Sequence, residues 1–118
     1  MPRAEQGRII LVEVLDPQNR NSKTRPAVIV STTEEIEADG NIACVAITTS
    51  VPDTLPAECI LLPFNLAGKS RTGLKARSAA MCSWVFEVTE DKIEKYIGLV
   101  PPKQLQEILA CLEKRRES

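Results

Sequence analysis

The chain has 118 residues, of which 43% are hydrophobic and 26% are charged, and its formal net charge is −1. A chain of this length is expected to form one domain, residues 1–118, that buries roughly two thirds of its unfolded surface. The apolar runs are too short for a membrane-spanning helix, and the first ten residues lack the apolar stretch of a signal peptide. These features predict a soluble, cytoplasmic protein without a membrane partner.

The sequence predicts five strands before any long helix. In chain order they are Arg8–Leu15, Ala27–Ser31, Ile42–Thr49, Glu58–Leu62 and Ser78–Val88. An acidic, turn-rich segment, TTEEIEADGN, follows the second strand, and a long loop, residues 63–77, precedes the fifth. Long loops in compact domains are usually functional or mobile.

Two helices are predicted towards the end of the chain. Thr89 can cap a short helix whose apolar side is Ile93, Tyr96 and Ile97. The second helix opens at Pro101-Pro102, and its apolar residues fall at helical spacing: Leu105, Ile108, Leu109 and Leu112. The order of elements predicts a mainly β (α+β) fold, in which about five strands form a small, strongly bent sheet or barrel. The short helix and the C-terminal amphipathic helix lie outside it.

Arg25 stands directly before Pro26 and a short apolar run. Because proline has no N–H, Pro26 is expected to be the first residue of the second strand. Arg25 is then a fixed cation at the mouth of that strand. It is either a solvated strand end or a binding group for something anionic.

Two stretches without acidic residues carry much of the positive charge. They lie between Asp16 and Glu34 and between Glu58 and Glu87. Together they hold seven of the fifteen basic residues: Arg20, Lys23, Arg25, Lys69, Arg71, Lys75 and Arg77. If the fold brings both loops to one face, they form a positive groove that suits a phosphate backbone. The alternative is that these charges are simply solvated.

The absence of histidine from the sequence excludes much familiar chemistry. Ser-His and Cys-His nucleophile pairs are impossible, and no zinc-type spacing joins the cysteines. Phosphate-binding glycine motifs are also absent, so no cofactor or metal is expected. The four cysteines are Cys44, Cys59, Cys82 and Cys111, and their apolar or helical surroundings favour buried thiols over disulfides.

The chemistry that remains is an arginine with hydroxyl groups. The third strand ends in Thr48, Thr49 and Ser50, whose hydroxyls either fill strand positions or bind phosphate together with Arg25. Trp84, the only tryptophan, alternates with Cys82 and Phe86 on the fifth strand. This position favours packing in the core or at a dimer interface, with stacking on a nucleic-acid base as the alternative.

The segments GRIILVEVLDP, RPAVIVS, VAITTS and TGLKARSAAMC, followed by an amphipathic helix, resemble the MazF/PemK family over about residues 7–115. These proteins are toxins of bacterial toxin–antitoxin pairs that cut single-stranded RNA without a metal. The resemblance implies an SH3-like barrel that forms a homodimer. It also implies that Arg25 and Thr48 are the catalytic residues.

The mechanism that the resemblance implies is attack of the ribose 2′-OH on the adjacent phosphorus. Arg25 would donate two N–H groups, and Thr48 its hydroxyl, to the oxygens that gain negative charge. RNA-binding roles then fall on neighbouring residues: Arg20, Lys23, Thr49, Ser50, Lys69 and Arg71. The partner antitoxin would be an acidic, initially disordered peptide that folds across the same basic residues and the 63–77 loop.

Two features depart from the family pattern. The loop before the arginine is the short QNRNSK, which lacks the usual glutamate. Met81 and Ser83 occupy the positions where some relatives carry an arginine and an aspartate, and Phe86 stands near that of another arginine. The Arg25–Thr48 pair favours a nuclease. The missing last-strand pair favours a non-catalytic member that acts by binding, as the gyrase poisons of this fold or a degenerate regulator would.

Overall fold

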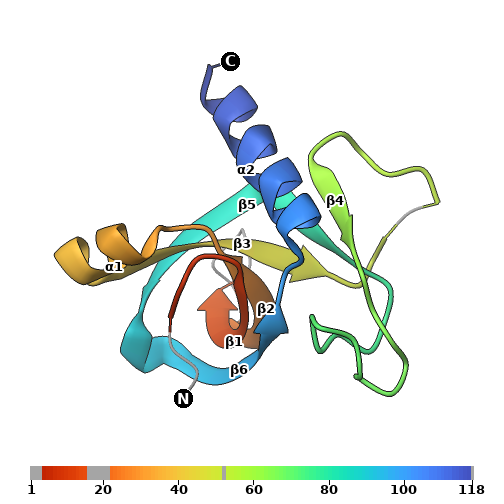
Figure 1. Cartoon of the computed structure of the whole chain (residues 1–118), viewed down its shortest axis with the longest axis horizontal. Coiled ribbons are helices and arrows are strands. Elements are labelled where there is room, and N and C mark those ends of the chain that lie inside the picture. Colours follow the sequence, from red (N-terminus) through yellow and green to blue (C-terminus); the bar gives the residue numbers. More distant parts are fainter. Residues whose placement is uncertain (1–3, 16–21, 52, 118) are drawn as a thin grey trace.

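The computed structural model describes residues 4–15, 22–51 and 53–117. Within them lie six strands: β1 (Arg8–Leu15), β2 (Ser22–Ile29), β3 (Asn41–Thr48), β4 (Cys59–Leu62), β5 (Ser78–Thr89) and β6 (Ile93–Leu99). They form one antiparallel, strongly curved sheet in the order β4-β5-β3-β2-β1-β6 (Figure 1). Helix α1 (Thr33–Asp39) joins β2 to β3, and α2 (Pro102–Glu117) follows β6. The predicted mainly β class with a C-terminal helix is confirmed, with one strand more than expected.

Buried apolar side chains form two clusters on the two faces of the sheet, because successive strand residues point to opposite sides. The first cluster consists of Ile9, Val28, Val45, Ile47, Leu62, Leu74, Ala80, Cys82, Val100 and Ile108. The second cluster consists of Ala4, Ile10, Val12, Ala27, Ile29, Ile42 and Cys44. Helix α2 covers the first cluster with Leu105, Ile108 and Leu112, as its spacing predicted. No helix in the described part of the chain combines the length and apolar character needed to cross a bilayer.

The short helix lies at a different place from the one predicted. The acidic segment after β2 forms α1, which begins after Thr32. The Thr32 hydroxyl accepts a hydrogen bond from the Glu35 N–H, and the Glu35 carboxylate accepts one from the Thr32 N–H, both at 3.1 Å. This capping box starts the helix, and Gly40 ends it with a φ of 75°.

The helix predicted after Thr89 is wrong. Residues Glu90–Lys92 form one 3₁₀ turn, and the chain then continues as β6 along β1. The spacing of Ile93 and Tyr96 indicated a helix, yet both side chains pack against the second cluster from a strand. One irregularity in the β1–β6 pairing makes this possible. Leu11 pairs with Lys95 but Val12 pairs with Ile93, so Glu94 is an inserted residue that brings Ile93 and Tyr96 to the same face.

The prediction that Pro26 starts a strand is also wrong, because β2 already begins at Ser22. Pro26 pairs with Leu11 of β1. On the other side of β2, the ladder with β3 begins only at Ala27. Pro26 therefore lies just outside that ladder, where its missing N–H leaves no β3 carbonyl without a partner.

The 63–77 loop is tied to the sheet despite its length. Thr72 is fully buried, and its hydroxyl donates to the Pro63 carbonyl at 2.7 Å and accepts from the Leu74 N–H at 3.2 Å. The Leu99 N–H of β6 donates to the Arg71 carbonyl at 3.0 Å. The loop leaves β4 at one edge of the sheet and contacts β6 at the other, so it holds the two edge strands together.

We expect Gly98→Ala to release this loop. A Cβ at Gly98 would lie 2.4 Å from the Thr72 carbonyl oxygen, which is backbone and cannot simply rotate away. The cost in unfolding free energy should be about 1–3 kcal/mol, as for an overpacked core, and the loop should become sensitive to proteolysis. Gly40→Ala is the control, because a Cβ there meets no atom. Its cost in unfolding free energy is only that of placing an alanine in the left-handed conformation, about 1–2 kcal/mol. Urea denaturation and limited trypsin digestion measure both; a Gly98→Ala loop as resistant as that of Gly40→Ala would contradict the argument.

Candidate active site

Arg25 lies inside β2, where it pairs with Val12 of β1. The prediction that it lies at the end of its strand is therefore wrong. Arg25 lies two residues before the ladder with β3 begins. Its side chain is half-buried. The cation therefore stands beside the point where β2 and β3 part.

Thr48 is the last residue of β3 and pairs with Ala79 of β5. Its side chain is half-buried. The Thr48 hydroxyl oxygen accepts a hydrogen bond from the Ser50 N–H at 3.1 Å. Because this bond occupies the oxygen as an acceptor, the hydroxyl proton remains available for another acceptor.

Arg25 and Thr48 lie on the same face of the sheet. Ala27 of β2 pairs directly with Ala46 of β3, and this is the last pair of the ladder. Two residues further along each strand lead to Arg25 and Thr48, whose side chains therefore share the face of Ala27. Ala27 belongs to the second cluster, so this is also the face of Trp84.

Trp84 contacts Arg25 directly. The guanidinium carbon of Arg25 lies over the Trp84 ring, 5.2 Å from its centroid, which is a cation–π geometry. A large bulge in β5 places the ring there. Val45 of β3 pairs with Val85, but Ala46 pairs with Met81, so residues 82–84 have no partner on β3.

Arg77 joins the site, although the sequence indicated it only as one of the seven basic residues in the acid-free stretches. Its Nη1 donates to the Val51 carbonyl at 3.2 Å, just after the end of β3. Arg77 is exposed and lies two residues before Ala79, the partner of Thr48. The structure thus adds a second cation beside the Thr48 end of the sheet. The feature of the sequence that indicates Arg77 is its position at the end of the 63–77 loop, which contains no acidic residue.

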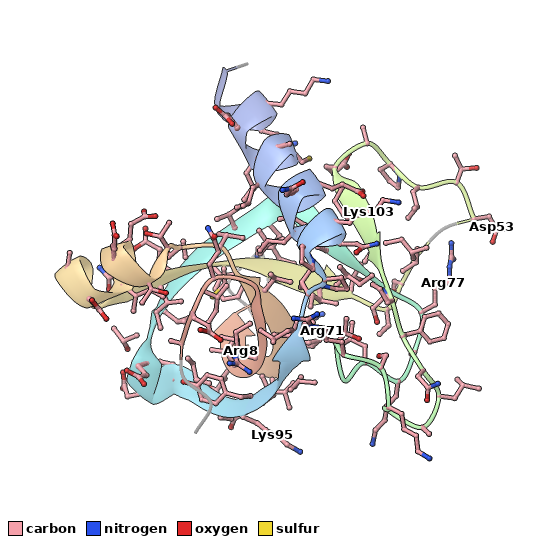
Figure 2. The ribbon with its side chains drawn as sticks, in the orientation of Figure 1. Arg8, Asp53, Arg71, Arg77, Lys95 and Lys103 are labelled. Carbon is pink, nitrogen blue, oxygen red and sulfur yellow. The ribbon has the colours of Figure 1, made fainter. Side chains whose placement is uncertain are left out.

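Lys69 and Arg71, which were predicted to bind RNA, lie elsewhere on the same loop. Both side chains are exposed. Arg71 stands beside the junction of β6 and α2, apart from Arg77 (Figure 2). Among the described residues, no hydrogen bond or ion pair connects Lys69 or Arg71 to Arg25 or Thr48. The loop therefore presents its charges on more than one side.

The remaining predicted binding residues are placed only in part. Thr49 and Ser50 are exposed and directly follow Thr48. Lys23 pairs through its backbone with Val14, but its side chain lies outside the described part of the structure. Arg20 falls entirely outside the described residues.

The cysteines and the last-strand positions add no acid or base to the site. Met81 is half-buried and Ser83 is exposed. Burial raises the pKa of the Cys44 and Cys82 thiols to about 12, so neither is a thiolate at neutral pH. All four cysteines are free thiols, and the prediction of burial is confirmed for Cys44 and Cys82 only. Within the described ranges, no group of three metal-ligating side chains is placed to hold an ion.

A comparison with protein families identifies most of the chain. Residues 5–115 match the model of the PemK-like, MazF-like toxins of type II toxin–antitoxin systems. No curated protein gives a significant match in sequence.

Solved structures of the same fold support this match. MazF from Deinococcus radiodurans (Form-I) is 13% identical, with a TM-score of 0.75 over 100% of both chains. An endoribonuclease from a mycobacterial species, solved with its cognate antitoxin, has a TM-score of 0.74 and 13% identity over 98% of this chain and 96% of that one. The Mycobacterium tuberculosis toxin MazF-mt6 has a TM-score of 0.66 and 18% identity, over 92% of this chain and 95% of that one. At 13–18% sequence identity, the similarity to these structures shows a shared fold.

Proposed function

This chain belongs to the PemK-like, MazF-like toxins of type II toxin–antitoxin systems, a family of endoribonucleases, and we propose that it cleaves single-stranded RNA without a metal ion. The observation that carries the proposal is the placement of Arg25 and Thr48 on one face where β2 and β3 part. Those two residues supply hydrogen-bond donors for a phosphate. The reaction takes place in the cytoplasm, where RNA is present and the four thiols stay reduced.

The reaction is an in-line attack of the ribose 2′-OH on the neighbouring phosphorus. It forms a 2′,3′-cyclic phosphate and releases the 5′-oxygen of the next nucleotide as a hydroxyl. Negative charge accumulates on the two non-bridging oxygens in the transition state. A group that donates hydrogen bonds to those oxygens more strongly at that moment accelerates the step.

Arg25 and Thr48 have complementary parts in this scheme. The guanidinium is permanently charged and donates two parallel N–H groups, which fits the geometry of a phosphate. The Thr48 hydroxyl donates one more bond, because the Ser50 N–H already uses its oxygen as an acceptor. Neither group removes the proton from the 2′-OH, since a guanidinium barely deprotonates at neutral pH and the Thr48 hydroxyl is no stronger a base than the 2′-OH itself. Water accepts that proton, and the departing 5′-oxygen takes up a proton from water.

Removing either donor should reduce cleavage with little effect on the fold. We expect Arg25→Ala to lower kcat by roughly 10²–10³-fold. Thr48→Val, which keeps the shape of the side chain but removes the hydroxyl, should lower kcat by a similar factor. Thr48→Ser, which restores the hydroxyl, should recover most of the rate. Single-turnover cleavage of a fluorescent single-stranded RNA, in buffer with a chelator, measures these rates, and thermal unfolding checks the fold.

The matched control for Thr48 is Thr49→Val, which removes a neighbouring exposed hydroxyl. It should leave kcat within about twofold, since the proposal gives that hydroxyl no transition-state bond. Equal rates for Arg25→Ala and the parent would overturn the nuclease proposal. A protein that binds RNA tightly but never cleaves it would support the alternative of a binding-only member, which the residues Met81 and Ser83 favour.

The positive face for RNA extends from Thr48 through Arg77. Arg77→Gln removes the charge but keeps an amide donor for the Val51 carbonyl, so the loop should stay in place. We expect weaker binding of single-stranded RNA of any sequence, and a salt dependence whose slope is lower by roughly 0.7, the value for one lost phosphate contact. Lys95→Gln on β6 is the control, because it removes one exposed charge that lies well apart from Arg77 (Figure 2). Identical salt slopes for the two variants would remove Arg77 from the RNA path.

The chain is also proposed to act as a homodimer. Strand β4 is an edge of the sheet and has only four residues, and Leu61 on it is 40% exposed. A short edge strand with an exposed apolar side chain is a surface that proteins usually cover. Phe64 and Leu66 of the adjoining loop, 41% and 82% exposed, lie outside the proposed dimer contact. A stable dimer would bury roughly 1,200–2,000 Å² in total.

The second partner is proposed to be an antitoxin segment that is acidic and initially disordered. Its carboxylates would pair with the basic residues from Arg25 to Arg77, and its apolar side chains would contact Phe64 and Leu66. We expect such a peptide to compete with RNA and to bind less tightly at high salt, though with a smaller salt effect than RNA. Leu66→Ser should weaken the peptide without changing RNA cleavage. Sedimentation and competition titrations test both partners. A monomer at micromolar concentration would contradict the dimer, and a peptide that binds without displacing RNA would contradict the shared surface.

A further inference from the structure

Arg25 has no carboxylate partner among the described residues. An ion pair in the described part of the chain joins Arg8 to Glu5 and does not involve Arg25. Arg25 is nevertheless half-buried, and its guanidinium lies over the face of Trp84. An arginine side chain loses considerable rotamer freedom when it is held in one place. The contact with the indole ring is the interaction that offsets this loss.

We propose that Trp84 is the positioning residue of the site, holding the guanidinium of Arg25 on the face that carries Thr48. The proposal rests on the proposed function, in which Arg25 binds the scissile phosphate. Trp84 itself touches no reacting atom. It acts only through the orientation that it gives to Arg25.

An aromatic partner suits this task better than a carboxylate would. A carboxylate accepts two guanidinium N–H groups and neutralises the charge, so it competes with the phosphate. A ring below the guanidinium attracts the cation through its π electrons, while the N–H groups point outwards in the guanidinium plane. Arg25 is thus fixed in position with its full charge and its fork of donors free for the substrate.

The β5 bulge supports this assignment. Before the bulge, Ala80 packs into the first cluster; after the bulge, Phe86 packs against the second cluster together with Trp84. The unpaired residues 82–84 therefore shift the alternation of side chains along β5. Even-numbered side chains after the bulge lie on the opposite face of the sheet from those before it. Without that change the ring would lie on the face of α2, away from Arg25. The same geometry argues against base stacking, because the guanidinium already covers one face of the ring.

Kinetics of three variants test the proposal. Trp84→Leu should lower kcat for single-stranded RNA about 5- to 30-fold with little change in KM, which is the range expected from losing a half-buried cation–π contact. Trp84→Phe, which keeps a weaker π face, should recover part of the loss. Phe86→Leu is the matched control, since it trims an aromatic side chain of the same cluster and strand and should leave kcat within about twofold. In an Arg25→Ala background, Trp84→Leu should have no further effect on kcat.

A second measurement does not depend on cleavage. Trp84 is the only tryptophan, so intrinsic fluorescence reports on this ring alone. Arg25→Ala should uncover the ring and increase its quenching by acrylamide, whereas Arg25→Lys, which keeps a cation, should remain closer to the parent. Binding of a 2′-deoxy oligonucleotide, which cannot react, should shift the emission of the parent but not that of Arg25→Ala.

The two measurements separate failure of this inference from failure of the proposed function. If the parent cleaves RNA but Trp84→Leu and Phe86→Leu lose activity equally, the ring is merely core and the positioning role is wrong. If quenching is the same in the parent and Arg25→Ala, the contact does not exist in solution and the inference falls whatever the activity. If the parent never cleaves RNA but the quenching differs as expected, Trp84 still positions Arg25, and the nuclease proposal alone is overturned.

Discussion

The register between β2 and β3, fixed by the pairing of Ala27 with Ala46, is the constraint on which the site depends. Side chains alternate along each strand, so a slip of one residue would turn either Arg25 or Thr48 to the opposite face. Burial enforces the register, because Ala27 and Ala46 are almost fully inaccessible to solvent. Packed segments of β2 and β3 connect this pair to Arg25 and Thr48. The packing of the core therefore sets the position of the two donors, and neither donor needs to stabilise the fold.

Irregular strands do the remaining positioning. A perfectly alternating β5 would direct Trp84 to the face that α2 covers, and a perfectly alternating β6 would turn Tyr96 away from the second cluster. In each case extra residues in one strand change which face the following side chains occupy. The bulge in β5 breaks ladder hydrogen bonds, and in exchange it places a ring below Arg25. Bulges beside functional residues are common for this reason.

Short apolar runs between turn signals predicted strands at β1 to β5, and helical spacing of apolar residues predicted α2. The predictions fail at α1 and β6. Ile93 and Tyr96 have helical spacing, and only the pairing with β1 reveals that an inserted residue explains it. Thr32 and Glu35 form a capping box that indicates the start of α1, although the acidic segment around them also has the composition of a turn. For the site, a short local pattern identified Arg25 and Thr48, whereas the Arg25–Trp84 contact joins residues far apart in sequence and depends on a bulge that composition does not reveal.

The charge of the whole chain, −1, conceals the property that matters for an anionic substrate. Acidic residues gather on α1, which lies on the opposite side of the molecule from the 63–77 loop (Figure 1). The molecule extends 33–39 Å along its principal axes, which is several times the screening length of roughly 8 Å at physiological ionic strength. Carboxylates on α1 therefore do little to weaken the field at Arg77, which lies on the side of the loop (Figure 2). A nearly neutral protein can attract a polyanion to one face while it remains free of the non-specific binding that a large net positive charge would cause.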